Sequence, residues 1–409
     1  MTTFAFSYND IVAESLHLYS ENIPRILVDD FEKKESKRAR DVRVAGNSII
    51  SYYEQKIAEK EIGKEALALH SLKEIRALIF KNLLKKGDNI VTFNSFELYS
   101  ENREALNSRG IEVRISDDGE LKTFLSLIDS NTKFIYLETI SKEYINIPDF
   151  YKIISFAKEK EIPVIVDNTS GGSGYLIKPI ELGAHIVIEN TNEWLQEEYG
   201  FFNAFIVEGK PFNWRKKFLH LKAEDLIEDY SIYPRSLFVG KQPLEEASSI
   251  LYYLKGYRNK VKHNIEFHIY TSQLVQSIAE SEEKVLLRSK TAETLASWLK
   301  SKEYIKKVQY TGLPESKSYF NALRYFSNGF GNKLSFELKE YIDTKRLFVV
   351  MSKNLLLKNH ISYNEEKSSI HLAVPAVSER EIRLLFDNVY EEYVNEINPY
   401  TLSSKRIII

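Results

Sequence analysis

The sequence contains no cysteine among its 409 residues. This absence excludes disulfide bonds, thiolate metal ligands and a cysteine nucleophile. The chain also has no uninterrupted apolar run that approaches the roughly 18 residues of a membrane-spanning helix. Its beginning shows no basic stretch followed by an apolar one. We therefore expect no signal peptide, no membrane partner and a cytoplasmic location.

The sequence also lacks an excess of charge of either sign. Its 56 Lys and Arg residues nearly balance its 58 Asp and Glu residues, for a formal net charge of −2. Because nucleic acids and anionic membranes attract strongly basic proteins, the overall charge favours neither as a partner. The hydrophobic fraction of 43% is ordinary for a globular protein, and 409 residues exceed what one hydrophobic core usually serves. We therefore expect more than one domain.

Three regions differ in their sequence patterns. Residues 1–64 include the charge-rich segment 29–43 and predict an N-terminal arm followed by a helix. Residues 65–243 alternate helices with short apolar strands, which predicts a large α/β domain with a mostly parallel, doubly wound sheet. Residues 244–409 predict a smaller C-terminal α+β domain that ends in a helix over 378–397. The predicted strands are Asn89–Phe93, Glu112–Ile115, Phe134–Glu138, Val164–Val166, Ile186–Ile188, Ala204–Val207, Lys333–Leu338 and Ser369–Ala373.

Polar residues follow two of these strands, at the edge of a parallel sheet where ligands usually bind. Asp167 and Asn168 directly follow one strand, and an acidic loop that contains Glu193 and Glu197 follows the next. Asp167 is either a functional carboxylate or the cap of the following turn. The acidic loop is either a solvated helix or, if its carboxylates converge with Asp167, a site for a divalent cation, a polyamine or a cationic side chain.

Neither the glycine-rich segment nor the histidines predict a nucleotide or metal site. The segment 171–174, Gly-Gly-Ser-Gly, lacks the lysine and the spacing of a nucleotide phosphate loop, and we interpret it as a flexible connection. His263 and His268 are five residues apart on a predicted helix, which places them on different faces.

Several segments together resemble one enzyme family. The stretch VIVDNTSGGSGYLIKPIELGAHIVIENTNEWL is similar to the Cys/Met metabolism enzymes that depend on pyridoxal phosphate (PLP), in particular the O-acetylhomoserine sulfhydrylases and cystathionine gamma-synthases. EALALHSL, KKGDNIVTFNSFELYS and VQYTGLPESKSYFNALRYFSNGFG resemble further family segments in the same order, over about residues 47–393. The resemblance implies PLP fold type I, aspartate aminotransferase-like, and a homodimer or homotetramer.

The resemblance also identifies a missing residue. Family members bind PLP through a Schiff base to a lysine, and the aligned residue in this chain is Glu193. Residues 179–209 contain no lysine or arginine, so a shift in the alignment supplies none. A Schiff base needs a primary amine, which among side chains only lysine offers. We therefore expect no catalytic residue of the family's type and no cofactor.

Other cofactor contacts of the family change as well. The Ser-Gly pair that holds the phosphate becomes Ser71 followed by leucine, and the stacking tyrosine aligns with Glu97, two residues before Tyr99. The arginine that binds a substrate carboxylate aligns with His371. The resemblance thus implies a substrate contact at His371 and a vestigial pocket of Asp167, Asn168, Ser71, Tyr99, Glu97 and Glu193.

These changes favour a degenerate member of the sulfhydrylase and transsulfuration family. Such a pseudoenzyme would serve assembly or regulation, paired with itself or with an active paralogue. One alternative is a PLP-independent enzyme that uses the acidic residues of the old cleft. A second alternative is a working PLP-dependent sulfhydrylase or lyase of sulfur amino-acid metabolism.

Overall fold

The computed structural model describes residues 53–93, 104–116, 120–141, 145–191, 204–218, 250–251, 254 and 267–397. Within this part of the chain the strands form one sheet of seven strands and one of four. Close contacts group the described residues into two compact units. The first lies within residues 53–84, 163–165 and 179–281, and the second within residues 85–162, 166–178 and 282–397. The predicted domain boundaries at residues 64 and 243 stay a prediction.

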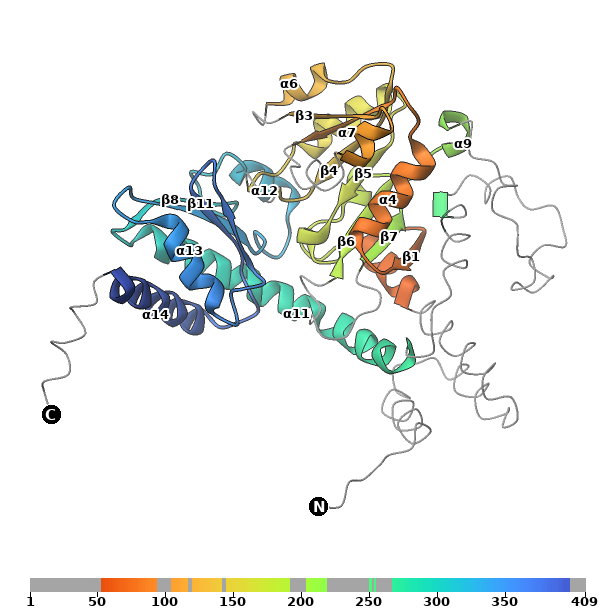
Figure 1. Cartoon of the computed structure of the whole chain (residues 1–409). Helices are drawn as coiled ribbons and strands as arrows, with labels where there is room; N and C mark the ends of the chain where they lie inside the picture. The colour runs from red at the N-terminus through yellow and green to blue at the C-terminus, as the bar shows by residue number, and fades with distance from the viewer. Residues whose placement is uncertain are drawn as a thin grey trace, which may run out of the picture. The chain divides into compact units, whose positions relative to one another are not determined.

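The seven-stranded sheet has the order β1-β7-β6-β5-β4-β2-β3 (Figure 1). Strand β2 is parallel to both β3 and β4, whereas β7 is antiparallel to both β6 and β1. The mostly parallel sheet confirms the predicted α/β fold. Its strands are β1 (Glu65–Leu69), β2 (Asn89–Phe93), β3 (Glu112–Ser116), β4 (Thr132–Glu138), β5 (Val164–Asp167), β6 (Ile186–Asn190) and β7 (Ala204–Glu208).

Strands β2 and β7 are buried along their full length. Ile90 and Val91 of β2, like Ile206 and Val207 of β7, are 0% exposed, so both faces of each strand are covered. Strands covered on both faces are apolar on successive residues rather than on alternate ones. This is why NIVTF and AFIVE could be recognised as strands in the sequence.

Helix α7, Phe150–Glu159, shows how local sequence determines the start of a helix. Asp149 is its N-cap, and the carboxylate accepts a hydrogen bond from the Lys152 backbone N–H at 3.4 Å. The buried face repeats every three to four residues and consists of Phe150, Ile153, Ile154 and Ala157. Further described helices are α4 (Leu72–Leu83), α6 (Leu121–Ser126), η1 (Thr169–Gly171), α8 (Pro179–Leu182) and α9 (Trp214–Lys217), and residues 53–61 and 104–108 are also helical.

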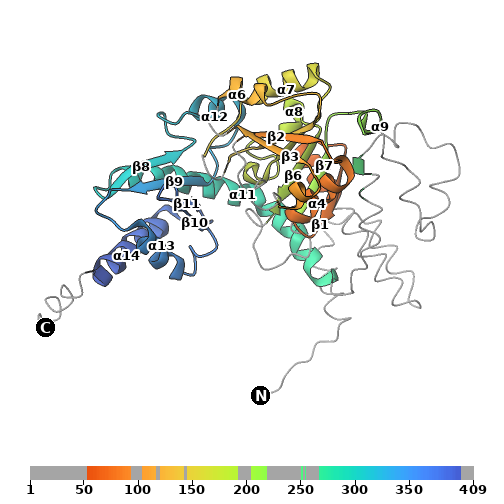
Figure 2. The same ribbon diagram turned by 45° about the horizontal axis from the view of Figure 1, so that its top comes forward.

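The four-stranded sheet has the order β10-β11-β9-β8, and its neighbouring strands are antiparallel. Its strands are β8 (Ile305–Tyr310), β9 (Lys333–Leu338), β10 (Ile361–Asn364) and β11 (Ser369–Ala373). The associated helices are α11 (Phe267–Lys300), α12 (Tyr319–Tyr325), α13 (Thr344–Lys353) and α14 (Glu379–Ile397). Helices α13 and α14 lie side by side (Figure 2).

One face of the four-stranded sheet is apolar and forms a core with these helices. Leu334 pairs with Leu372, and Phe336 pairs with Ile370, across β9 and β11. All four side chains are buried, and they belong to one hydrophobic cluster with residues of α11, α13 and α14. The opposite face carries serine, glutamine and histidine, as the alternation of side chains along a strand requires.

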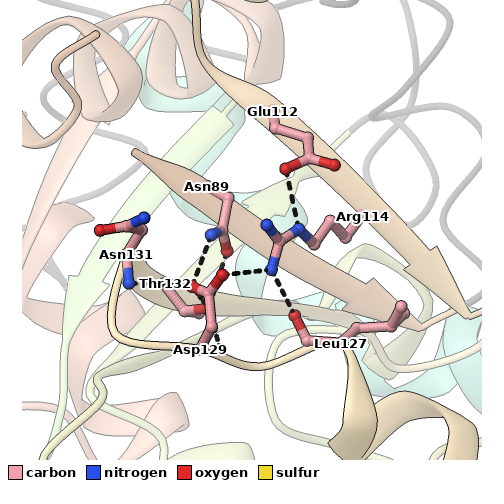
Figure 3. Close-up of polar contacts among 7 residues, drawn as sticks. All are labelled: Asn89, Glu112, Arg114, Leu127, Asp129, Asn131 and Thr132. Carbon is pink, nitrogen blue, oxygen red and sulfur yellow. Dashed lines mark hydrogen bonds and ion pairs between the residues drawn. The ribbon is translucent and has the colours of Figure 1, made fainter. Parts of the chain in front are cut away.

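A polar network ties together the amino-terminal ends of β2, β3 and β4 (Figure 3). Arg114 donates through Nη1 to Asp129 Oδ2 at 2.7 Å and to the Leu127 carbonyl at 2.9 Å. Asn89 donates to Asp129 Oδ1 at 2.8 Å and accepts from the Thr132 hydroxyl at 2.7 Å. The hydrogen bond from Asn89, followed by that from Arg114, lowers the pKa of Asp129 to about 2. The network aligns three strands at the edge opposite the one where ligands usually bind.

None of the helices in the described part of the chain is long and apolar enough to cross a bilayer. No group of three or more His, Asp or Glu side chains in the described ranges is arranged to hold a metal ion.

Candidate functional site

Asp167 is the last residue of β5, and its carboxylate is held from two sides. It is 6% exposed. Oδ2 accepts a hydrogen bond from the Tyr136 hydroxyl of β4 at 3.0 Å. Oδ1 accepts from the Thr169 backbone N–H at 3.1 Å and from the Thr169 hydroxyl at 2.6 Å. The carboxylate therefore caps the next turn and is also oriented by a neighbouring strand. Its two predicted roles, as a turn cap and as a functional carboxylate, are compatible.

Asn168 is completely buried and joins three segments of the chain. Its Oδ1 accepts from the Thr139 hydroxyl at 2.6 Å, and its Nδ2 donates to the Ile177 carbonyl at 3.2 Å. The Thr139 backbone N–H donates to the carbonyl of Asp167 at 3.0 Å. These bonds fix the ends of β4 and β5 relative to each other.

The glycine-rich segment 171–174 is a buried, compact turn, so its interpretation as a flexible connection is wrong. A Cβ on Gly171 would lie 2.0 Å from Asn168 Oδ1. Gly172 has φ +63, and a Cβ there would lie 2.7 Å from Val285. Glycine is needed here because the backbone approaches neighbouring side chains too closely for any other residue.

Ser71 is the N-cap of α4, and the amino end of this helix contains its own carboxylate. The Ser71 hydroxyl accepts from the Glu74 backbone N–H at 3.1 Å. Glu74 Oε2 in turn accepts from the His70 backbone N–H at 2.9 Å. This arrangement is a variant of the capping box, in which serine and glutamate satisfy backbone donors reciprocally. The Glu74 carboxylate thus occupies a helix end that would otherwise suit an anion.

His371 lies on β11 within a buried polar row on the four-stranded sheet. It is 5% exposed, and its Nε2 lies 3.1 Å from the Ser369 hydroxyl oxygen. Its partner across the sheet on β9 is Ser335, whose hydroxyl donates to Gln309 Oε1 at 3.1 Å. The serine and glutamine side chains of this row are uncharged. The imidazole of His371 stands at the position that the resemblance aligns with the family's arginine.

Three of the predicted site residues, Glu193, Glu97 and Tyr99, lie outside the described residues. Of the acidic loop, only its start is described, where Glu189 at the end of β6 is 0% exposed. The proposed convergence of Glu193 and Glu197 with Asp167 stays a prediction.

Sequence reasoning did not single out Tyr136, Thr139 or Thr169, which orient Asp167 and Asn168. Tyr136 and Thr139 lie 31 and 29 positions from their partners in sequence. Tyr136 lies inside the apolar run FIYLE, where a buried tyrosine resembles any other core residue. Only the pairing of neighbouring strands shows that its hydroxyl reaches a carboxylate.

The sequence profile of the family "Cys/Met metabolism PLP-dependent enzyme" matches residues 25–378. A homocysteine/cysteine synthase of Saccharomyces cerevisiae is 31% identical over 313 residues, which are 72% of this chain and 66% of the relative. The chain therefore spans slightly less than two thirds of that relative's length. An O-acetyl-L-homoserine sulfhydrylase of Thermus thermophilus is 28% identical over 317 residues, 74% of this chain and 71% of the relative.

Solved structures share the fold. An O-acetylhomoserine (thiol)-lyase structure from Campylobacter jejuni, which contains pyridoxyl-lysine phosphate, matches with a TM-score of 0.67 and 22% identity over 83% of this chain and 85% of its own. The O-acetylhomoserine sulfhydrylase of Wolinella succinogenes matches with a TM-score of 0.63 and 21% identity over 84% and 96%. The fold is thus PLP fold type I, as the resemblance implied.

These comparisons correct one expectation. The absence of a cofactor, inferred from Glu193, is contradicted because the matching family is defined by its dependence on PLP and a structural neighbour carries a PLP–lysine adduct. The inference was wrong because a lysine missing from this loop would concern only the covalent link, whereas PLP enzymes also bind the ring and the phosphate by non-covalent contacts. The profile match covers most of the sequence, and the chain belongs to the family of Cys/Met metabolism PLP-dependent enzymes.

Proposed function

We propose that this chain is a divergent relative of the O-acetylhomoserine sulfhydrylases that binds PLP reversibly, without a covalent link to a lysine, and does not catalyse sulfhydrylation. In this proposal the scaffold serves assembly or regulation, as a pseudoenzyme. The observation that carries the proposal is the contrast between an oriented, buried Asp167 and residues 179–209, which contain no lysine.

The residues around Asp167 fit the ring of PLP. A buried carboxylate at the carboxyl end of a β-strand pairs well with a protonated pyridine nitrogen, because both charges are then compensated. Tyr136 and Thr169 hold the Asp167 carboxylate in place before any ligand arrives, which lowers the cost of ordering it. The binding role of Asp167 in this chain is therefore to orient the ring.

The amino end of α4 fits the phosphate poorly. A phosphate bound there would face the Glu74 carboxylate, which already accepts a backbone hydrogen bond at that helix end. Two unit charges of like sign at 4 Å repel by about 4 kcal/mol at an effective dielectric constant near 20. Weak binding that responds to ionic strength follows from this repulsion.

The covalent link is the third element. When bound, PLP supplies an electron sink for bonds broken next to its ring, and in enzymes that use it a lysine usually holds it and moves protons. Residues 179–209 offer neither a lysine nor an arginine, and the aligned position is Glu193, whose carboxylate cannot form an imine. The chain's own residues thus bind the ring but supply no amine from this loop.

A first experiment combines PLP binding with borohydride reduction. The full chain is incubated with PLP, reduced, digested and mapped by peptide mass spectrometry. We expect saturable binding that dialysis reverses, and no stoichiometric pyridoxyl-lysine peptide. A stoichiometric adduct on any lysine would overturn the non-covalent part of the proposal. The formation of homocysteine from O-acetylhomoserine and sulfide would favour the alternative, a working sulfhydrylase.

A second experiment restores the amine. We expect Glu193→Lys to form a borohydride-stable adduct at residue 193, because the substitution returns a primary amine to the position aligned with the family lysine. Glu198→Lys is the matched control, since it adds the same charge to the same acidic loop. Equal labelling of both variants would show that the loop carries no defined PLP site.

Asp167→Asn tests the ring contact separately. It keeps the size of the side chain and removes the charge that pairs with the pyridinium nitrogen, so we expect PLP to bind about tenfold more weakly. Asp387→Asn, at an exposed position on α14, is the control. Unchanged affinity in Asp167→Asn would place the ring elsewhere.

We also propose that the chain forms a homodimer or homotetramer or pairs with an active paralogue. The support is that the chain belongs to the Cys/Met metabolism family. The resemblance to that family implies a homodimer or a homotetramer. Light scattering after size-exclusion chromatography measures the molar mass of the particle. The mass of a monomer would contradict both the homodimer and the homotetramer. Mixing with an active family member before the same measurement tests the third.

A further inference from the structure

The loop between α12 and β9 contains the one Asn-Gly pair of the sequence, Asn328-Gly329. Both residues have positive φ, 57 for Asn328 and 132 for Gly329. Asparagine tolerates the left-handed region better than most residues do, and glycine adopts positive φ freely. A Cβ on Gly329 would also lie 2.3 Å from Ser289 Oγ. The path of the backbone therefore accounts for the presence of these two residues side by side.

The loop is attached to its surroundings on both sides of this pair. The Ser327 backbone N–H donates to the Leu176 carbonyl at 2.7 Å, and the Phe330 backbone N–H donates to Ser289 Oγ at 2.9 Å. Between these two anchors, the Gly329 backbone N–H donates no hydrogen bond to the described part of the chain. The pair also belongs to neither a helix nor a strand. The backbone nitrogen of Gly329 is thus not committed to an acceptor.

The side chain of Asn328 is exposed and reaches the segment that follows the glycine-rich turn. Its Nδ2 donates to the Tyr175 carbonyl at 3.0 Å. Two residues further along, the Ile177 carbonyl accepts from Nδ2 of Asn168, the residue after Asp167, at 3.2 Å. A single exposed hydrogen bond between neutral groups is weak, so the Asn328 side chain can leave Tyr175 without unfolding of the chain.

An asparagine that precedes glycine is open to attack by the next backbone nitrogen. The Gly329 nitrogen loses its proton and forms a bond to Asn328 Cγ. The bond from Cγ to Nδ2 breaks, and the departing group takes up a proton and leaves as ammonia. Water then opens the resulting succinimide at either carbonyl and leaves an aspartate or an isoaspartate. Glycine favours the first step because it has no side chain that hinders the approach.

We propose that Asn328-Gly329 is a site of spontaneous deamidation, and that its product weakens the attachment of the loop to the segment after the glycine-rich turn. Deamidation replaces the Nδ2 donor by a carboxylate oxygen, so that two acceptors, this carboxylate and the Tyr175 carbonyl, face each other. An isoaspartate also lengthens the backbone between the two anchors by one carbon atom. The modified fraction then increases with the age of the protein. This proposal does not depend on PLP binding.

The first test measures the reaction in the full chain without PLP. The chain is incubated at mildly alkaline pH, and mass spectrometry with chromatography separates the Asn, Asp and isoaspartate forms of its peptides. We expect conversion at Asn328 to be at least about tenfold faster than at Asn359, which is also exposed in a turn but precedes histidine. Equal rates at the two positions would overturn the proposal, as would no conversion at Asn328 in the folded chain when the chain in urea converts. Asn328→Gln should abolish the conversion, because the longer side chain cyclises slowly.

The second test measures the structural effect of the product. Asn328→Asp introduces the same carboxylate, and we expect the backbone amides of Leu176 and Ile177 to exchange hydrogen about three- to tenfold faster than in the parent chain. Asn354→Asp is the matched control, because Asn354 Oδ1 accepts from the Leu356 backbone N–H at 2.9 Å and an aspartate retains this acceptor. It should exchange like the parent in this segment. If Asn328→Asp also exchanges like the parent, the proposed weakening is wrong.

Discussion

The carboxyl end of β5 and the amino end of α4 contrast in what they leave for a ligand. At β5, Asp167 and Asn168 are buried and held by the hydroxyl groups of Tyr136, on the neighbouring strand β4, and of Thr139, directly after that strand. At α4, the side chains of the exposed Ser71 and of Glu74 accept hydrogen bonds from backbone N–H groups at the helix end. In the proposed binding mode, the first region offers an oriented carboxylate to a cationic ring nitrogen, whereas the second places the Glu74 carboxylate at a helix end that would otherwise suit an anion. The difference teaches that a strand end and a helix end of the same fold can offer a ligand opposite prospects, according to whether the local carboxylate is oriented for a cation or placed where an anion would bind.

The largest expected effect comes from disrupting the packed turn that follows β5. Gly171→Ala would place a Cβ 2.0 Å from Asn168 Oδ1, so the turn and the end of β5 must move. We expect a loss of about 3 kcal/mol in the free energy of unfolding, measured by urea denaturation. Gly87→Ala is the control, because Gly87 has φ +88 but no atom within 4 Å, and it should cost only about 1 kcal/mol. Similar costs for both would mean that the turn is loosely packed.

The next largest effect is on stability and concerns His185, which is hydrogen-bonded to the start of β5. Its Nδ1 accepts a hydrogen bond from the Val164 backbone N–H at 3.0 Å, and burial lowers the pKa of His185 to about 4. Between pH 6.5 and pH 4 the unfolded chain therefore binds a proton that the folded chain does not. Stability should fall by about 2 kcal/mol across this range as the pH decreases.

His185→Asn isolates this effect, since its amide oxygen can replace Nδ1 as the acceptor but does not titrate. Urea denaturation at a series of pH values should show a shallower decline for this variant than for the parent chain. Identical pH profiles would exclude His185 as the source.

A smaller effect tests the orientation of Asp167. Tyr136→Phe removes the hydroxyl that donates to Oδ2 and leaves the ring in place. We expect a loss of about 1 kcal/mol in the free energy of unfolding and a several-fold weaker affinity for PLP. Tyr151→Phe, on the exposed surface of α7, is the control for hydroxyl removal. A loss of stability without any change in PLP affinity would reduce Tyr136 to a structural role.

The smallest expected effect concerns the amino end of α4. Glu74→Gln keeps a hydrogen-bond acceptor for the His70 backbone N–H and removes the charge at the end of α4. We expect PLP to bind about two- to fivefold more tightly, with a change in stability below about 1 kcal/mol. Glu159→Gln, in the last turn of α7, should leave the affinity unchanged. If Glu74→Gln does not alter PLP affinity, the phosphate does not reach this helix end.

Much of the fold followed from local patterns. The strands predicted at Asn89–Phe93, Lys333–Leu338 and Ser369–Ala373 are confirmed with the same bounds, because apolar runs between turn residues determine them. Among the strands in the described part of the chain, three were missed: β1, β8 and β10. Strand β8, IKKVQY, contains two exposed lysines, and β10 has four half-buried residues, so neither shows the pattern of a buried strand.

By itself, the sequence determined the α/β fold, its family and the absence of lysine from residues 179–209, because these depend on composition, periodicity and residue order. Only the tertiary structure decided that Tyr136 and Thr169 orient Asp167, that Glu74 closes the end of α4 against an anion, and that segment 171–174 is a packed turn. The orientation of Asp167 by Tyr136 and the packing of Gly172 against Val285 join residues 31 or more positions apart. The Glu74 cap is local, but it depends on a side-chain conformation that a sequence pattern does not specify. A linear pattern shows which residues are available, and the pairing of strands decides which of them meet.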